Sequence, residues 1–356
     1  MKILFYTDLH FRYNGDFFQI SKSGHSNLLD ELTKSLTWLE SVIEEQKPDL
    51  VVCGGDIYHS MNSLDSHTVT VSFSALKHLC GVCESVGSQH IILLGNHDFI
   101  SEDRTVSIID FLNNFNKTQV INSLTKIDNL LFCPYYFAKE NMSIPDEFLQ
   151  QNKSSIFFGH LSLQGGYYKQ YKKINQTLAE TSFESLTQQV KSFKLAFNGH
   201  HHIPQVMGNV IFPGSFIQVN IDEPEMNIGR GVYLIDSETF SYKLIQNKSY
   251  SRMYRTYSPE ELVSIPDNSY VYFGNDNPEV IKSVSQELKR FLGHRTEKFS
   301  SNSEKKKSSD TSVEVSTLSN TELLEHYVSK IEIKSNVNSV LSFGKGCLNE
   351  ASSSSR

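Results

Sequence analysis

Five short clusters of aspartate, histidine and asparagine lie within residues 8–202, and their side chains are of the types that bind divalent metal ions. The clusters contain Asp8 and His10 (T-D-L-H), Asp56 (G-G-D), Asn96, His97 and Asp98 (G-N-H-D), His160 (F-G-H), and His200, His201 and His202 (N-G-H-H-H). Carboxylate, imidazole and amide oxygen donors together suit Mn²⁺, Fe²⁺ or Zn²⁺. A single histidine after a strand is usually a hydrogen-bonded surface residue. Five clusters, in contrast, suffice for two ions about 3.5–4 Å apart, the arrangement used for displacement at phosphorus.

Each of the first three clusters follows a short apolar run that is typical of a buried strand. The runs are ILFYT (3–7), LVVCGG (50–55) and HIILLG (90–95). Between the first two, Ser26 is a suitable N-cap for a helix whose apolar side chains recur at three and four residues, namely Leu28, Leu32, Leu36, Leu39 and Ile43. Because ligands bind at the carboxyl ends of strands in an open α/β sheet, we expect the clusters to meet there. An extended chain from Asp8 to His10 would place both side chains on one side.

From about residue 119 onward the sequence consists largely of further strand candidates. They are QVIN, LLFCPY, SIFFGHL, LAFNGH, VIFPGS, GVYLID and FSYKLIQ. We interpret this run as a second sheet packed against the first. The predicted fold is therefore α/β, with two facing mixed β-sheets flanked by helices over residues 1–248.

The character of the sequence changes after residue 248. Residues 249–295, to which part of 331–345 can be added, are predicted to form a small α/β domain that includes a helix over 278–292. Residues 296–318 are rich in Ser and Lys and predict a flexible linker. An amphipathic helix is expected over 319–334, followed by a tail over 335–356. Leu324, Tyr327 and Ile331 lie on the apolar stripe of that helix and are the expected contacts with a partner.

Composition limits the classes of function. The net charge of −7 does not favour a protein that coats nucleic acid by bulk electrostatics, so any contact with DNA must be local. Neither a secretory signal nor an apolar run long enough to span a bilayer is evident. We therefore expect a cytoplasmic protein that does not associate with a membrane. The five cysteines fit a reducing compartment, and the pair Cys80 and Cys83 lies at helical spacing that favours packing over zinc.

The order D-x-H, GGD, GNHD, GH and GHxH resembles the calcineurin-like metallophosphoesterases, whose five motifs all occur between Asp8 and His202. The resemblance implies the four-layer sandwich of that superfamily. It also implies two divalent ions, with Mn²⁺ favoured and Mg²⁺, Fe²⁺ or Zn²⁺ as alternatives. The implied ligands are Asp8, His10 and His202 for one ion and Asn96, His160 and His200 for the other, with Asp56 bridging them.

Within that superfamily the sequence is similar to the DNA nuclease subunits of the SbcD type. His59 follows Asp56 by three residues, His160 lies in GHLSLQGG, and FPGSFIQVNIDEPEMNIGRGVYLID follows the last motif. The similarity implies an exonuclease on duplex ends and an endonuclease on single strands. It implies a role in DNA repair or recombination beside an SbcC-type, SMC-like ATPase, in a bacterial or phage-infected cytoplasm. It further implies a DNA-capping role for 249–295 and a homodimer formed through residues 66–86 and 104–115.

Several side chains are expected to act beside the metal ligands. His97 is the candidate that protonates the leaving oxygen, with Asp98 orienting it, and His59 is the candidate that positions the phosphate. His201 is expected to be structural. Arg12, where the SbcD-type family usually has Leu-Gly after the first histidine, is a candidate phosphate contact. Arg252 and Arg255, which alternate with tyrosines, are candidate DNA contacts, although packing at a domain junction would explain the same pattern.

Two other classes of function use the same residues. A metallophosphatase or small-molecule phosphodiesterase would contain the same five motifs, and activity on DNA ends would distinguish it from a nuclease. A non-catalytic scaffold that recruits the ATPase is the other alternative, and decayed ligand positions would favour it. Every ligand position is filled here. The polarity of digestion and the preference for single or double strands do not follow from the sequence.

Overall fold

The structure of the chain is a computed structural model. It describes residues 1–60, 64–99, 106–135, 143–150, 155–169, 172–173, 180–223 and 228–297. The predicted tail and the partner-binding helix with Leu324, Tyr327 and Ile331 therefore lie outside the described residues, as does the added segment 331–345. Among the described residues, no helix combines the length and the apolar character needed to cross a bilayer.

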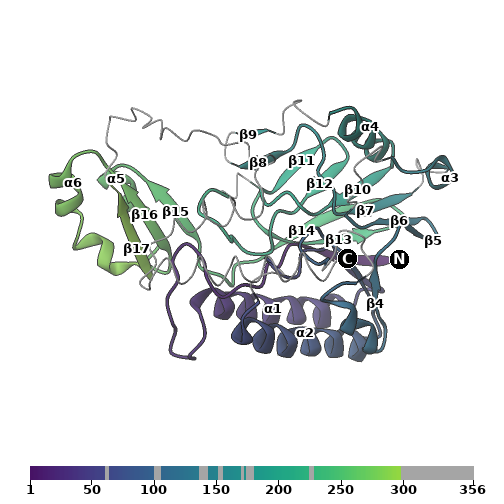
Figure 1. The fold of residues 1–356 in the computed structure, drawn as a ribbon, viewed down its shortest axis with the longest axis horizontal. Coiled ribbons are helices and arrows are strands. Elements are labelled where there is room, and N and C mark those ends of the chain that lie inside the picture. The colour runs from purple at the N-terminus through teal and green to yellow at the C-terminus, as the bar shows by residue number, and fades with distance from the viewer. Residues whose placement is uncertain are drawn as a thin grey trace, which may run out of the picture. The chain divides into compact units, whose positions relative to one another are not determined.

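The first sheet has six strands in the order β14-β13-β1-β2-β3-β4. Strands β1 (Lys2–Tyr6), β2 (Leu50–Cys53), β3 (Gln89–Leu93) and β4 (Thr118–Ile121) are parallel. Strands β13 (Gly231–Asp236) and β14 (Tyr242–Gln246) complete the edge beside β1 with antiparallel pairings. Helices α1 (Asn27–Gln46) and α2 (Ser66–Val86) cover the outer face of this sheet (Figure 1).

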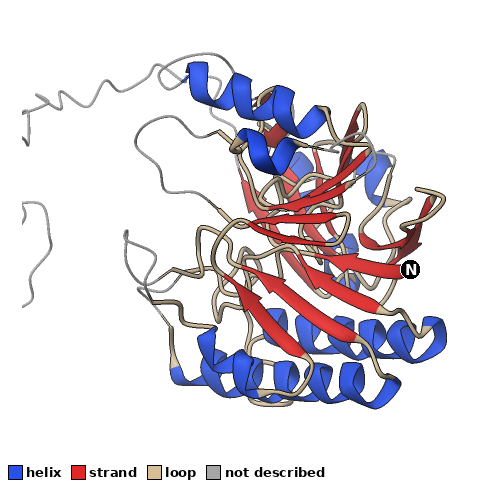
Figure 2. Cartoon of the chain, turned by 90° about the vertical axis from the view of Figure 1, so that its right-hand side faces the viewer, coloured by secondary structure: helices blue, strands red, loops and turns tan. Residues whose placement is uncertain are grey.

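The second sheet also has six strands, in the order β11-β12-β10-β7-β6-β5. Its strands are β5 (Thr125–Ile127), β6 (Leu130–Cys133), β7 (Ile156–Gly159), β10 (Leu195–Asn198), β11 (Gln205–Met207) and β12 (Val210–Phe212). Helix α4 (Glu180–Lys191) lies on the outer face, so that helix layers enclose the two sheets (Figure 2). The predicted α/β fold with two facing mixed sheets is confirmed. The strands predicted at QVIN, GVYLID and FSYKLIQ exist but join the first sheet.

The core between the two sheets consists of side chains that alternate along each strand. Phe5 of β1 faces inward, and its ring lies 5.5 Å from the rings of both Phe158 in β7 and Phe197 in β10. Its neighbours Leu4 and Tyr6 point the other way and pack with the helices. Successive strand residues point to opposite faces, so β1 is apolar on both sides. This rigid double layer holds the strand ends in place.

Helix α1 follows the sequence pattern closely. The hydroxyl of Ser26 accepts a hydrogen bond from the amide of Leu29, which satisfies a free amide of the first turn and stabilises the helix by about 1 kcal/mol. The predicted apolar stripe is buried, and the helix ends at Lys47 in a left-handed conformation. On α2, Cys80 and Cys83 are both buried in the core, in agreement with a packing role.

Residues 251–297 form a small subdomain with a sheet and a core of their own. Three parallel strands, β15 (Met253–Thr256), β16 (Tyr270–Gly274) and β17 (Gly293–Glu297), pack with the short helices α5 (Pro259–Leu262), α6 (Pro278–Ser283) and η3 (Glu287–Arg290). The single helix predicted over 278–292 is therefore two short segments. Strand β17 also includes residues 296 and 297, which the sequence pattern assigns to the linker.

Shorter elements complete the described chain. They are η1 (Asp110–Asn114), α3 (Asp146–Leu149) and the hairpin of β8 (Tyr167–Lys169) and β9 (Lys172–Lys173).

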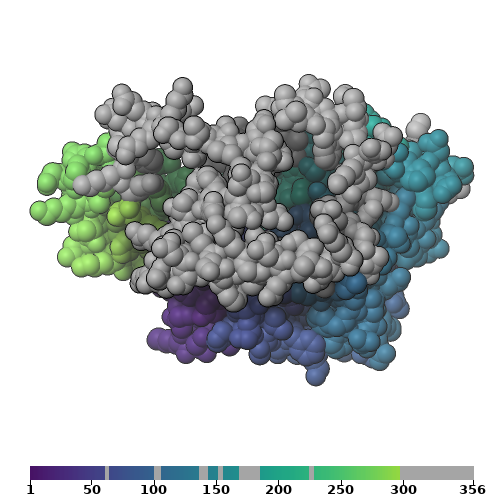
Figure 3. All heavy atoms as spheres, in the orientation of Figure 1, coloured from purple at the N-terminus to yellow at the C-terminus, as the bar shows by residue number. Residues whose placement is uncertain are grey.

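In the space-filling view, α1 and α2 form the purple and blue surface along the lower edge (Figure 3). Helix α2 contacts η1 through two aromatic rings. Phe73 of α2 is 45% exposed, and its ring centroid lies 5.5 Å from that of Phe111 in η1.

Candidate metal centre

All five sequence clusters follow strands near the middle of the two sheets. Asp8 and His10 follow β1, Asp56 follows β2 and Asn96 follows β3 in the first sheet, whereas His160 follows β7 and His200 and His202 follow β10 in the second. These five strands lie side by side within their sheets and present their carboxyl ends at the same edge. The fold therefore brings together side chains that are up to 194 residues apart in the sequence.

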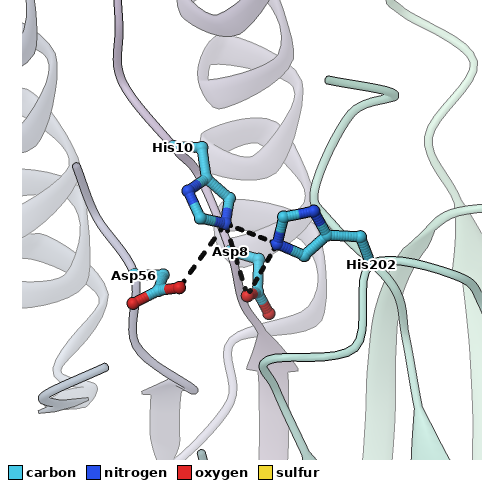
Figure 4. Close-up of side chains that lie close together, drawn as sticks. All are labelled: Asp8, His10, Asp56 and His202. Carbon is cyan, nitrogen blue, oxygen red and sulfur yellow. Dashed lines mark hydrogen bonds and ion pairs between the residues drawn. The ribbon is translucent and has the colours of Figure 1, made fainter. Parts of the chain in front are cut away.

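The first group of converging side chains consists of Asp8, His10, Asp56 and His202 (Figure 4). The Nε2 atoms of His10 and His202 lie 2.7 Å apart. The Nε2 atom of His10 is also 3.6 Å from a carboxylate oxygen of Asp8 and 3.6 Å from one of Asp56. One ligand atom from each of the four residues lies within 4.8 Å of all the others. We call this group the first position.

The second group consists of Asp56, His160 and His200, with the amide of Asn96 between the two histidines. Oδ2 of Asp56 is 3.3 Å from Nε2 of His160. Oδ1 of Asn96 is 3.2 Å from that same nitrogen and 2.8 Å from Nδ1 of His200. We call this group the second position. Asp56 belongs to both positions, as a bridging ligand must, so the structure brings together all seven predicted ligands.

The backbone at four of these residues adopts a conformation that is uncommon outside glycine. Asp8, His10, Asp56 and His200 have φ angles of 55°, 51°, 54° and 73°. The segment from Asp8 to His10 is thus not extended as predicted, and left-handed turns direct the two side chains into the site. Such conformations cost about 1–3 kcal/mol each and occur where surrounding structure imposes them, often at functional sites.

Two motif glycines are required because the strand ends approach each other closely. A Cβ atom at Gly95 would lie 2.1 Å from a carboxylate oxygen of Asp56. One at Gly199 would lie 2.4 Å from the hydroxyl of Thr7 and 2.8 Å from the ring of His160. Any larger side chain at either position would push the ligand-bearing segments apart. The glycines before the metal-type residues therefore have a steric role.

The donor chemistry of the cluster fits a divalent cation. The Nδ1 atom of His202 lies 2.8 Å from the carboxylate of Glu223, and the Nδ1 atom of His160 lies 2.6 Å from the carbonyl oxygen of Gly54. Both partners only accept hydrogen bonds, so these outer nitrogens carry hydrogen and the inner Nε2 atoms are the ones whose lone pairs can bind an ion, in His160 after release of a proton. Carboxylate oxygens of Asp8 and Asp56 face the same space, and such a convergence of acceptors requires a positive charge.

Charge coupling between the side chains is strong. Burial alone would raise the pKa of Asp56, but the positive potential of His160 and His10 holds it well below its ordinary value. Burial would lower the pKa of His160, but Asp56 and Asp8 reverse this and raise it to about 9. The pKa of His200 is lowered to about 3 by burial and by the nearby charge of His160. A cation at the second position must therefore compete with a proton on His160.

His59 and His97 lie together beside the first position. Their rings are stacked with centroids 5.6 Å apart, and each ring also contacts His10 edge to face, at 5.3 and 5.4 Å. The amide of His97 donates to a carboxylate oxygen of Asp56 at 2.9 Å, and its side chain is 36% exposed. Burial and the charge of Arg12 lower the pKa of His59 to about 3, so this imidazole is neutral. Both residues are half-buried.

The carboxylate of Asp98 has a different position from the one expected. It is fully buried and accepts hydrogen bonds from the backbone amides of Gly95 (2.9 Å), Asp56 (2.8 Å) and Ile57 (3.0 Å). Within the described chain, no hydrogen bond joins it to the His97 ring. Because these amides occupy its oxygens, Asp98 shapes the loop that presents Asp56, and the predicted orientation of His97 by Asp98 is corrected.

His201 turns away from both positions. Its ring accepts a hydrogen bond from the amide of Leu163 at 3.2 Å, donates to the carbonyl of Tyr167 at 3.3 Å and packs on Phe212. It thus ties the segment after His160 to the segment after β10. This placement matches the structural role expected from its position between two ligands.

The candidate DNA-binding arginines are engaged within the protein. Arg12 donates to Nε2 of His59 at 3.0 Å and to the carbonyl of Val219. Arg255 pairs with Asp222 at 2.9 Å and lies 4.9 Å from the ring centroid of Tyr272. Arg252 also has an interaction with another group. The structure therefore gives Arg12 a position beside His59 and gives Arg255 a position at the junction with the small subdomain.

Sequence reasoning missed residues that support the site from behind. Glu223 contacts His202, and the fully buried Arg230 contacts the backbone of both. Tyr135 packs against the ring of His200 with centroids 5.4 Å apart. No spacing rule marks Glu223 among the acids of the segment DEPE. The only signal was its place within the segment after the last histidine motif.

The comparisons with known proteins agree with this geometry. Residues 1–204 match the family described as calcineurin-like phosphoesterase, which covers more than half of the chain. The chain belongs to this family. It is accordingly a metallophosphoesterase-type hydrolase of phosphoester bonds with a candidate site for divalent metal ions. No curated protein matches it.

The solved structures that match the chain are distant in sequence. The phosphoesterase Yfce from E. coli is 13% identical and matches over 70% of this chain and 96% of its own length, with a TM-score of 0.31. TT1561 of Thermus thermophilus is 10% identical over 69% of this chain and 99% of its own, with a TM-score of 0.39. A dimetal phosphatase from Danio rerio is 12% identical over 66% and 91%, with a TM-score of 0.38. At these values the likenesses add no argument about substrate.

Proposed function

We propose that the chain is a DNA nuclease of the SbcD type that hydrolyses phosphodiester bonds with two divalent ions, Mn²⁺ being the favoured metal. The observation that carries the proposal is the meeting of all seven donor side chains at one edge of the two sheets, with Asp56 in both groups. The paired rings of His59 and His97 lie beside that edge. A site of this composition suits hydrolysis at phosphorus.

Each group in the site has a separate task in the proposed reaction. Two bound divalent ions would supply Lewis acidity that neutralises phosphate charge and makes a water molecule a better nucleophile. A bond forms between the water oxygen and phosphorus while the bond to the 3′ or 5′ oxygen breaks, and the leaving oxygen takes up a proton. His97 is placed to provide that proton, because its half-exposed ring lies beside Asp56, with Nε2 4.0 Å from a carboxylate oxygen. His59, held by Arg12, orients the phosphate.

The preference for DNA over small phosphodiesters rests on what surrounds the site. The context of His160, GHLSLQGG, is similar to that of the SbcD-type nucleases. The small subdomain is fastened to segments that also reach the metal ligands: Met253 donates to Gln218, and Arg255 pairs with Asp222, the neighbour of Glu223. A second surface next to the metal centre suits a polymer more than a small ester.

The proposed partners follow from the same resemblance. A homodimer through α2 and the region of η1 is supported by the exposed apolar side chains Val69 and Phe73, 43% and 45% exposed. The helix over 319–334 is proposed to dock on an SbcC-type ATPase in the cytoplasm. Sedimentation at micromolar concentration should give about twice the monomer mass of 40.5 kDa. Deletion of 318–356 should abolish copurification with the ATPase and retain cleavage of single strands.

The nuclease proposal is tested with end-labelled linear duplex, circular single strands and bis(p-nitrophenyl) phosphate as parallel substrates. Each is incubated with Mn²⁺, with a chelator, and with the Asp56→Asn variant as the inactive control. We expect Mn²⁺-dependent cleavage of both DNA substrates. Hydrolysis of the small diester alone would instead indicate a small-molecule phosphodiesterase. If no substrate is cleaved while the ATPase still binds, the chain is a scaffold and the proposal is wrong.

A further inference from the structure

Glu223 is a buried carboxylate directly behind one candidate metal ligand. Its Oε1 atom lies 2.8 Å from Nδ1 of His202, the ring nitrogen that faces away from the metal position. Its other oxygen accepts a hydrogen bond from the hydroxyl of Ser215 at 3.3 Å, and the residue is 7% exposed. Glu223 is therefore held on both oxygens in a single orientation.

A buried arginine fixes this arrangement. Arg230 is 1% exposed and donates from Nη1 to the carbonyl of His202 at 2.6 Å and to the hydroxyl of Ser215 at 2.8 Å. Its Nη2 atom donates to the carbonyl of Glu223 at 2.7 Å. The guanidinium thus links the backbone of His202, the hydroxyl of Ser215 and the backbone of Glu223, and its nearby positive charge compensates the negative charge of the buried Glu223 carboxylate.

The second position lacks an equivalent among the described residues. There, the outer nitrogen of His160 faces the neutral carbonyl of Gly54 at 2.6 Å. The 2.8 Å contact between His200 and Asn96 joins two candidate ligands of that same position. The first position also contains Asp8 in addition to the shared Asp56. Two carboxylates and a third behind His202 thus serve the first position, whereas one shared carboxylate serves the second.

We infer that Glu223 is a positioning residue that makes the first position, formed by Asp8, His10, Asp56 and His202, the tighter of two unequal metal sites. This inference rests on the proposed two-ion centre. An ionised carboxylate that accepts a hydrogen bond from the outer N–H of an imidazole fixes the tautomer and makes the inner nitrogen a stronger metal ligand. Loss of such a partner typically lowers metal affinity 10–100-fold. The ion at the first position should therefore bind first and leave last.

The test is a calorimetric titration of the chelator-treated full chain with Mn²⁺ alone. The wild type should show two unequal binding phases. The Glu223→Gln variant keeps the size of the side chain, and its tighter phase should weaken by about 10–100-fold while the weaker phase stays unchanged. In a His160→Ala background, which removes a ligand of the second position, the same substitution should weaken the single remaining phase by the same factor.

Glu40→Gln is the matched control, because Glu40 contacts Nδ1 of His78 at 2.7 Å on the helical layer and neither residue is near the strand ends. It should leave both phases unchanged. If Glu223→Gln fails to fold beside Arg230, Glu223→Asp keeps the charge and shortens the reach toward His202, and it should also weaken the tighter phase selectively. Unchanged phases, or equal weakening of both, would overturn the role of Glu223. Absence of Mn²⁺ binding by the wild type would overturn the proposed metal centre itself.

Discussion

The two metal positions use similar ligands in different electrostatic surroundings. The first combines Asp8 and Asp56 with two histidines, one of which has Glu223 behind it. The second combines the shared Asp56 with an amide and two histidines, and the outer nitrogen of His160 faces a neutral carbonyl. Burial opposes the positive charge of both His160 and His202, but Asp56 raises the pKa of His160 and Glu223 raises the pKa of His202. The difference teaches that two metal positions built from common motifs can differ in metal affinity because of a carboxylate, Glu223, that lies outside those motifs.

Removal of the shared ligand should have the largest effect, because it damages both positions at once. We expect Asp56→Asn to lose both ions and to reduce cleavage by on the order of 10³-fold or more, since several kcal/mol of transition-state stabilisation disappear and each 1.4 kcal/mol is a factor of ten. Elemental analysis of the purified variant and a single-turnover assay measure the two effects. Retention of two ions by this variant would mean that Asp56 is not the bridge.

Removal of a ligand from one side should separate the two positions. His160→Ala is expected to lower the bound Mn²⁺ from about two ions to about one, because His160 is a member of the second group alone. Equilibrium dialysis against Mn²⁺ gives the stoichiometry, and His10→Ala provides the mirror experiment on the first position. Loss of both ions in either variant would contradict the separation and show that the two positions bind metal only together.

Removal of His97 should spare both positions and still slow the reaction. His97→Ala leaves every candidate ligand in place, so the ion content should be that of the wild type while turnover falls by about 10²-fold or more through loss of the proton donor. The experiment pairs metal analysis with turnover on labelled DNA. Asp98→Asn is informative beside it: because Asp98 holds the Asp56 loop, we expect lower thermal stability and weaker metal binding. Turnover of His97→Ala equal to wild type would remove this residue from the mechanism.

Binding at the second position should depend on pH. The pKa of His160 is raised to about 9, above its ordinary 6.5, so without metal the ring is protonated at pH 7 and must release that proton to bind an ion. Apparent affinity there should rise about tenfold per pH unit up to about pH 9. Calorimetry at pH 7 in buffers of different ionisation enthalpy should detect about one released proton. Proton release that is zero for the weaker phase would contradict this assignment.

The smallest effect is expected at the junction with the small subdomain. Arg255 and Asp222 form a pair whose side chains are 32% and 42% exposed, and such pairs contribute about 0–1 kcal/mol. Arg255→Ala should therefore lower the free energy of unfolding slightly and leave Mn²⁺ binding unchanged. Fluorescence anisotropy with labelled single strands then tests the DNA contact, because a loss of affinity larger than the loss of stability explains would assign Arg255 to the substrate.

The ligands could be predicted because metal chemistry restricts residue types and the fold restricts where they lie. Asp8, Asp56 and His160 each follow a recognisable apolar strand, so residue type and local pattern point to the same place. The order of strands could not be predicted in the same way. Strand β13 pairs with β1 more than 220 residues earlier, and nothing in its local pattern distinguishes that partner from a neighbour in the second sheet.

The supporting contacts were harder to predict for a physical reason. Asp98 is adjacent to His97 in the sequence, yet its side chain turns to backbone amides of another loop, because buried amides need acceptors. Glu223 reaches His202 across 21 residues that include the short strands β11 and β12, and it lies in the segment after them. Such contacts depend on the path of the backbone in three dimensions. Residue type alone does not reveal them.

The central claim, that two divalent ions occupy the cluster around Asp56, is tested most directly by anomalous diffraction from crystals of the protein grown with Mn²⁺. The account predicts two peaks about 3.5–4 Å apart on either side of Asp56. One should lie among Asp8, His10 and His202 and the other among Asn96, His160 and His200. A single peak, or peaks away from these side chains, would contradict it.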